Sequence, residues 1–179
     1  KTEFNPPSLR TQSFYEPDLK MMNPAHNSAE AESSIKRAQD FGFENLSIDL
    51  IYGSPTSDMK IWKENLQKTI DLQVPHISSY ALTVEPKTAL DKMIALHRKE
   101  NIDAEKQSCQ FQMLMELMFQ AGYEQYEISN FAKPGLRSRH NSSYWQGKNY
   151  LGLGPSAHAF NGGSRQWNVA NNALYRQTI

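Results

Sequence analysis

The chain has 179 residues, and its 19 Lys and Arg residues balance its 19 Asp and Glu residues, so its formal net charge is zero. This length suits a single domain with a core of useful size. The balanced charge gives no indication of nucleic acid or an anionic membrane as a partner. No apolar run reaches the length of a membrane span and the first residues do not form a signal peptide, so we expect a soluble cytoplasmic protein.

Helical and strand-like segments alternate over the first two thirds of the chain. Asn27 and Glu30 have the spacing of a capping box, which predicts a helix start at Ser28. Glycine and proline residues separate the apolar strand-like runs from the helices. The predicted elements are a helix from 28 to Gly42, strand 46–52, a helix from about 57 that Pro75 ends, strand 76–84, a helical or irregular segment 88–100, helix 103–121 and strand 126–129.

The last third of the chain is richer in glycine and polar residues. Residues 133–139 form a basic loop, and residues 150–155 are glycine-rich. A strand is expected at 157–160, a turn at 161–164, and a helix from Ala170 onward.

This order is typical of parallel βα units, and the fold class that we predict is α/β, a partial (β/α) barrel. Strand 46–52 is apolar nearly throughout, which suits a sheet covered on both faces. A complete eightfold barrel needs roughly 250 residues, so the chain would hold only part of one. In helix 103–121 the residues expected to face the core are Phe111, Leu114, Met115, Met118 and Phe119.

In such barrels, binding and catalytic groups gather at the carboxyl ends of the strands. Asp49 is an acid within an apolar strand, and a buried carboxylate that lacks its partner would cost roughly 3–5 kcal/mol. Asp49 therefore either binds a ligand or makes a structural hydrogen bond, and the sequence leaves both alternatives open. The strand-end residues selected by this rule are Asp49, Tyr52, Thr83, Glu85, Glu127 and Ser129.

A polar and aromatic stretch at residues 140–145 is the second candidate site. Imidazole can ligate iron and aromatic side chains can pack on a flat ring, although a loop histidine is more commonly only a surface residue. Gly152 and Gly154 lack the residues that complete a phosphate-binding loop, so close backbone packing is the better interpretation. The one cysteine, Cys109, excludes a cysteine-only cluster within the chain, and its helical context predicts a buried or half-buried apolar role.

Four segments carry motifs that are specific only in combination. They are Glu3-Phe4-Asn5-Pro6, Gln12-Ser13-Phe14, residues 47–55 and residues 75–88. Together they resemble the ends of the third, fourth, fifth and sixth strands in the radical-SAM family around oxygen-independent coproporphyrinogen III oxidase (HemN). The resemblance covers essentially the whole chain and implies a radical-SAM partial barrel, which we expect to be truncated at both ends.

The second half of the chain narrows this resemblance to the HemW branch of the family. Residues 122–135, the 140–145 stretch and residues 150–158 carry it. HemW proteins are heme chaperones, which bind heme and pass it to a client protein. The resemblance therefore implies heme or a porphyrin as ligand, His140 as the metal ligand, and supporting roles for Asn141, Tyr144 and Trp145.

The resemblance also implies S-adenosylmethionine and a 4Fe–4S cluster as cofactors. By motif position, S-adenosylmethionine would be held by Glu3, Gln12, Asp49 and Thr83. The three cysteines that hold the cluster in this family are absent from the chain and are expected upstream of Lys1. We therefore expect no radical chemistry from the chain as it stands, and we assign no catalytic residue.

Two local departures accompany the resemblance. Only residues 7–11 separate Pro6 from Gln12, whereas a βα crossover needs a dozen residues or more, so we expect a gap of roughly 20 residues here. Pro24 stands where the family has a cofactor-binding arginine, which weakens the affinity expected for S-adenosylmethionine. The predicted domains are a barrel portion with strands 3 to 6 at residues 1–132, and a HemW-like segment with an incomplete C-terminal domain at 133–179.

Three functions stay open on the sequence alone. The first is part of a heme chaperone, which the 140–145 stretch favours. The second is oxidative decarboxylation of coproporphyrinogen III by the parent protein, and the third is a fragment without activity of its own. An open partial sheet would leave its edges exposed, and a homodimer is one way to cover them.

Overall fold

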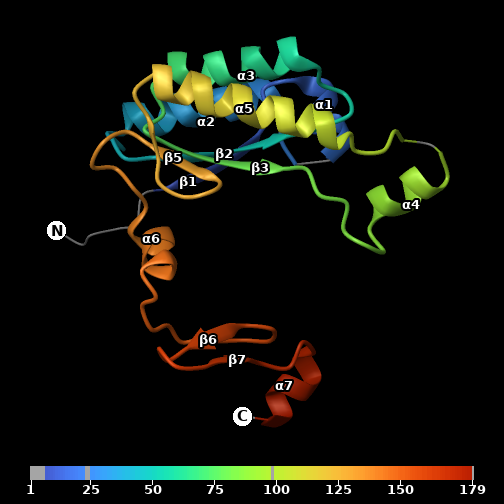
Figure 1. Ribbon diagram of the computed structural model, residues 1–179, viewed down its shortest axis with the longest axis vertical. Helices are drawn as coiled ribbons and strands as arrows, with labels where there is room; N and C mark the ends of the chain where they lie inside the picture. The colour runs from blue at the N-terminus through green and yellow to red at the C-terminus, as the bar shows by residue number, and fades with distance from the viewer. Residues whose placement is uncertain (1–6, 23–24, 98, 179) are drawn as a thin grey trace. The chain divides into compact units, whose positions relative to one another are not determined.

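The computed structural model describes residues 7–22, 25–97 and 99–178 (Figure 1). The chain divides into two compact units, of which the first ends at Arg137 and the second begins at Ser138. The first unit contains β1 (Ser8–Gln12), α1 (Glu16–Met22), α2 (Ser28–Asp40), β2 (Ser47–Tyr52), α3 (Met59–Asp71), β3 (His76–Ala81), α4 (Ala89–Ala95), α5 (Ala104–Gln120), β4 (Glu124–Gln125) and β5 (Asn130–Ala132). The second contains α6 (Arg139–Trp145), β6 (His158–Phe160), β7 (Arg165–Trp167) and α7 (Asn172–Thr178).

The first unit is built on a five-stranded sheet with the order β1-β2-β3-β5-β4. β1, β2 and β3 are parallel, which confirms the predicted βα alternation for this part of the chain. β5 is antiparallel to β3 and to β4. The prediction of a strand at residues 126–129 is wrong, because these residues form the turn between β4 and β5. The Glu127 carboxylate closes that turn by accepting a hydrogen bond from the Ser129 amide at 2.9 Å.

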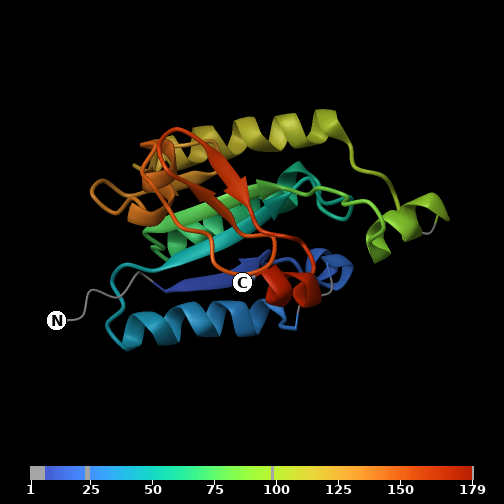
Figure 2. The same cartoon turned by 90° about the horizontal axis from the view of Figure 1, so that it is seen from below.

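Helices α2, α3 and α5 lie on the same face of this sheet, as the two ribbon views show (Figures 1 and 2). Ile48 and Leu50 of β2 are fully buried in the core that these helices cover. The opposite face carries the polar alternate residues Ser47 and Asp49. The expected cover of helices on both faces is therefore not found among the described residues of this unit.

Three predicted helices have the start or the packing that the sequence indicates. The capping box of Asn27 and Glu30 begins α2, and Asp58 caps α3 by accepting a hydrogen bond from the Ile61 amide. In α5, four of the five predicted core residues pack in or against the core. Phe119 is the exception at 80% exposed, because one residue beyond Met118 the helix has turned by about 100°.

The second unit holds a two-stranded antiparallel sheet, β6 with β7. The strand, turn and helix predicted for this region are confirmed. Gly152 packs tightly as expected, since a Cβ there would overlap the backbone of residues 157 and 158. The same expectation is wrong for Gly154, where a Cβ would meet nothing within 4 Å. Across the two units, no described helix combines the length and the apolar character that a membrane crossing requires.

Candidate functional site

A cavity of about 830 Å³ lies at the carboxyl ends of the three parallel strands. Gln12 is the last residue of β1, Ile51 lies next to the end of β2, and Leu82 and Thr83 follow β3. Lys20 and the two residues after it bring α1 into the same wall. The position is the one at which β/α barrels carry their binding groups.

Gln12 has the most unusual environment in this cavity. Its backbone is in the left-handed region, with φ of 62°, at an irregularity in the register between β1 and β2. The side chain is 7% exposed, and its Oε1 has no hydrogen-bond partner among the described residues. A buried carbonyl oxygen without a partner is costly, so this atom is suited to accept a hydrogen bond from a ligand.

Asp49 shapes the cavity through Gln12. Its Oδ1 accepts hydrogen bonds from the backbone amides of Thr11 at 2.6 Å and Gln12 at 3.3 Å. Asp49 therefore makes structural hydrogen bonds, which was one of its two predicted roles, and its carboxylate stabilises the strained end of β1. Direct contact between Asp49 and a ligand stays a prediction.

Two further residues were predicted to bind S-adenosylmethionine, Thr83 and Glu3. Thr83 lines the cavity and its side chain is exposed. Glu3 lies outside the described residues, as does Pro24. The structure therefore brings Gln12, Asp49 and Thr83 to one end of the sheet and leaves Glu3 untested.

Sequence reasoning selected Glu85 but missed the three cations of the cavity wall. Arg10, Lys20 and Lys99 contribute three cations, and Glu85 contributes one carboxylate. Arg10 stands two residues before Gln12 on β1, and this spacing places the two side chains on the same face of a strand. This two-residue spacing could have identified Arg10 from the sequence. Lys20 and Lys99 belong to separate segments that only the fold brings together.

The opposite, amino-terminal end of the sheet carries a buried polar network around His76. Its ring nitrogens hydrogen-bond with Ser47 Oγ at 2.7 Å and with the Tyr126 hydroxyl at 2.7 Å. Burial lowers the pKa of His76 to about 4, and the nearby Glu127 carboxylate opposes this shift only in part. His76 is therefore neutral near pH 7, and its place at the start of β3 indicates a structural role.

The second candidate site lies on α6, in the second unit. Ser138 caps this helix by accepting a hydrogen bond from the Asn141 amide. The His140 ring meets the Tyr144 ring edge to face, with centroids 5.0 Å apart, and Tyr144 in turn meets Tyr150 at 4.9 Å. His140 is exposed, so its imidazole is accessible on a helix that an aromatic ladder fixes in place.

The other predicted members of this site lie on the same helix. Trp145 is 62% exposed and Asn141 is half-buried. Since one turn of an α-helix separates residues i and i+4, Asn141 and Trp145 are neighbours, as His140 and Tyr144 are. Large exposed aromatic side chains beside an exposed histidine can pack on a flat, apolar ring.

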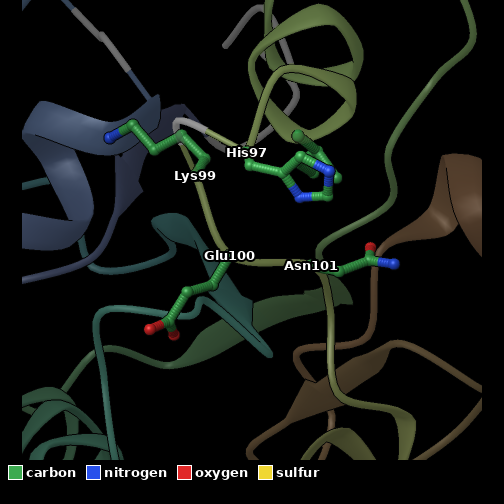
Figure 3. A pocket seen from close by; sticks show the side chains of 5 residues that line it. His97, Lys99, Glu100 and Asn101 are labelled. Carbon is green, nitrogen blue, oxygen red and sulfur yellow. The ribbon is translucent and has the colours of Figure 1, made fainter.

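A further cavity of about 430 Å³ lies beside α4 (Figure 3). The side chains of Lys99 and Glu100 point away from those of His97 and Asn101, so these groups do not converge on a common ligand. No cluster of three or more His, Cys, Asp or Glu side chains suited to a metal exists in the described segments. Cys109 is exposed, contrary to its predicted burial, because its neighbour Gln110 occupies the inward position on α5.

Comparison with solved structures defines the class of fold. The structure matches coproporphyrinogen III oxidase (HemN) from Escherichia coli, described as a radical SAM enzyme, with a TM-score of 0.76. The match covers 98% of this chain and 43% of that chain, at 20% sequence identity. The predicted partial barrel of the radical-SAM type is therefore confirmed.

Sequence comparison then identifies the relatives. The chain is 36% identical to the heme chaperone HemW of Bacillus subtilis over 90% of its length, and 34% identical to HemW of Escherichia coli over 84%. It is 32% identical to the mouse mitochondrial radical S-adenosyl methionine domain-containing protein 1 over 84%. These matches span 43%, 39% and 34% of the relatives, so the chain corresponds to less than half of their length. No family model matches the chain. The predicted resemblance to the HemN and HemW proteins is confirmed over this segment.

Proposed function

We propose that this chain is part of a HemW-like heme chaperone and that it binds heme through His140. The observation that carries the proposal is the exposed imidazole of His140, held against Tyr144 on α6, in a chain whose sequence relatives are heme chaperones. A neutral imidazole is a common axial ligand of heme iron, and exposed aromatic groups beside it suit a porphyrin face. A heme-receiving client and a cytoplasmic location belong to the same proposal.

The strand-end cavity supports S-adenosylmethionine as a second ligand of this protein. The ligand has hydroxyl and amino donors for the unpaired Gln12 Oε1, and a carboxylate for the cations of the cavity wall. Gln12 and Thr83 would contact it directly, and Asp49 would hold the backbone of Gln12. In the radical-SAM group, a 4Fe–4S cluster supplies the electron that cleaves this cofactor; with Cys109 as the only cysteine, the chain does not provide a cluster's ligand set.

Coproporphyrinogen oxidation is the second candidate function, and the fold match to HemN is the observation in its favour. The sequence of this chain is 20% identical to that of HemN and 36% identical to that of HemW from Bacillus subtilis, which favours the chaperone. The chaperone is therefore the function that we place first.

Heme titration tests the proposal. Increasing heme is added to the chain and to its His140→Ala variant while the Soret band is recorded. We expect the wild type to bind and the variant to bind at least about tenfold more weakly, because the axial ligand is lost. The matched control is His97→Ala, which removes another exposed histidine, in the first unit, and should leave the titration unchanged. Equal affinities of wild type and His140→Ala would contradict the assignment of His140.

A further inference from the structure

A buried polar cluster lies where the exits of β1 and β2 meet α1 and α3. Its centre is Asp18 of α1, which is 1% exposed. Asp18 Oδ1 accepts a hydrogen bond from Thr56 Oγ1 at 2.5 Å, and Oδ2 accepts one from Ser13 Oγ at 3.1 Å. Both oxygens of one carboxylate are thus engaged, each by a different strand-exit turn.

The partners of Asp18 are themselves fixed. Ser13 Oγ accepts hydrogen bonds from Asn65 Nδ2 at 3.1 Å and from the Tyr15 amide at 3.0 Å. Thr56 Oγ1 lies 2.7 Å from Ser54 Oγ, and Ser54 is fully buried. A connected network of this kind specifies one arrangement of the turns that it joins.

This network touches the wall of the strand-end cavity at both of its ends. On one side, Ser13 directly follows Gln12, which lines the cavity. On the other side, α1 continues from Asp18 to Lys20 and Met21, which line the cavity, and Ser54 Oγ lies 3.8 Å from Met21 Sδ. The carboxylate therefore connects the elements that shape the cavity.

An ordinary helix-start carboxylate would look different. Acidic residues in a first helical turn act through backbone N–H groups and the helix dipole, and they normally stay in contact with water. Asp18 is buried and bonds to two hydroxyls from outside its own helix. Burying a carboxylate is costly, so a buried carboxylate with such partners points to a need for fixed geometry.

We infer that Asp18 is a positioning residue of the strand-end cavity, which joins the exit turns of β1 and β2 to α1 and so holds Gln12, Lys20 and Met21 in the geometry that binds the ligand. This inference rests on the proposed binding of S-adenosylmethionine in the cavity. Asp18 does not line the cavity, and it acts through the residues that do.

The test measures the affinity of the chain for S-adenosylmethionine by isothermal titration calorimetry. Asp18→Leu removes both hydrogen bonds and should weaken binding about tenfold, because a small misplacement of the binding groups is enough for such a loss. Asp18→Asn can still bond to both hydroxyls and should recover most of the affinity. The matched control is Tyr123→Phe, which removes a buried hydrogen bond to the Val74 carbonyl just before β3, at the other end of the sheet, and should bind like the wild type. Equal affinity of Asp18→Leu and the wild type would overturn the inference, as would an equal loss in Tyr123→Phe.

Hydrogen exchange separates the inference from the proposed function. In Asp18→Leu, amides of residues 13–22 and 53–57 should exchange at least about tenfold faster than in Tyr123→Phe. Faster exchange in a chain that fails to bind S-adenosylmethionine would support the anchoring and overturn the proposed ligand. Unchanged exchange would overturn the inference itself. If Asp18→Leu does not fold, Thr56→Val removes one of the two bonds at an exposed residue and serves in the same comparisons, with a smaller loss of about threefold.

Discussion

The two units of this chain are built on opposite principles. The first has a continuous core of buried apolar side chains contributed by its sheet and by α2, α3 and α5. In the second, Ala159 is the only buried hydrophobic residue among those described, while Trp145 and Trp167 are 62% and 70% exposed. Burial of apolar surface drives folding, so the first unit contains the source of its own stability and the second does not. The second unit thus leaves its large aromatic side chains exposed, and heme binding is proposed at this surface.

A matched pair of tryptophan substitutions gives the largest expected contrast. Trp62 is 1% exposed and its Nε1 donates to the Gln110 carbonyl at 2.9 Å. Trp62→Ala should lower the free energy of unfolding by about 3–5 kcal/mol, from the lost burial and the cavity left behind. Trp167→Ala should change it by less than about 0.5 kcal/mol, because the ring is exposed. Urea unfolding followed by far-ultraviolet circular dichroism measures both, and similar losses would break the contrast between the units.

Acidification should act on the first unit through His76. Its pKa falls from 6.5 to about 4 on burial, so between these values the unfolded chain binds a proton that the folded chain does not. The stability that neutral His76 contributes is complete above pH 6.5 and is lost as the pH falls toward 4, in total on the order of 2–3 kcal/mol.

Denaturant unfolding at pH 7, 6, 5 and 4 measures this dependence. His76→Gln should flatten the curve in that window, whereas His158→Gln, at an exposed residue of the second unit, should leave the wild-type slope in place. If the free energy of unfolding of His76→Gln still falls with pH as it does in the wild type, groups other than His76 cause the pH dependence.

Two glycines give the smallest contrast. Gly53 and Gly154 both have positive φ, of 81° and 101°, so alanine is strained at either position. A Cβ at Gly53 would also overlap the Gln107 side chain, which donates to the Leu82 carbonyl, whereas nothing lies within 4 Å at Gly154. We expect Gly53→Ala to cost about 2 kcal/mol and Gly154→Ala about 1 kcal/mol. Thermal unfolding of the two variants compares them, and a larger loss at Gly154 would contradict the argument.

The parts of the fold that could be predicted are those set by local pattern. The capping box at Asn27, the strand 46–52 and the periodicity of α5 each follow from spacing within a few residues. The antiparallel turn at 126–129 was not predicted, because the position of β5 is set by its antiparallel pairing with β3, a distant segment of the sequence. The same periodicity of α5 predicted that Phe119 faces the core, but the rotation of the helix by one residue beyond Met118 places it in solvent.

The candidate sites divide in the same way. Strand-end position selected Asp49, Thr83 and Glu85, and the polar and aromatic composition of residues 140–145 selected His140. The family motifs added Gln12 and implied ligands for Asp49, Thr83 and His140. Asp18 carried no signal, because its partners Ser13 and Thr56 lie 5 and 38 residues away in the sequence and only the fold brings them together. Roles that depend on such long-range contacts need coordinates.

The placement of the three tryptophans gives each unit its own optical label. Trp62 is shielded in the core, whereas Trp145 and Trp167 are open to solvent. A water-soluble quencher therefore removes the emission of the second unit first and leaves the blue-shifted emission of Trp62. Events in the folded sheet and events at the surface around α6 can in this way be followed separately in one sample, without any attached dye.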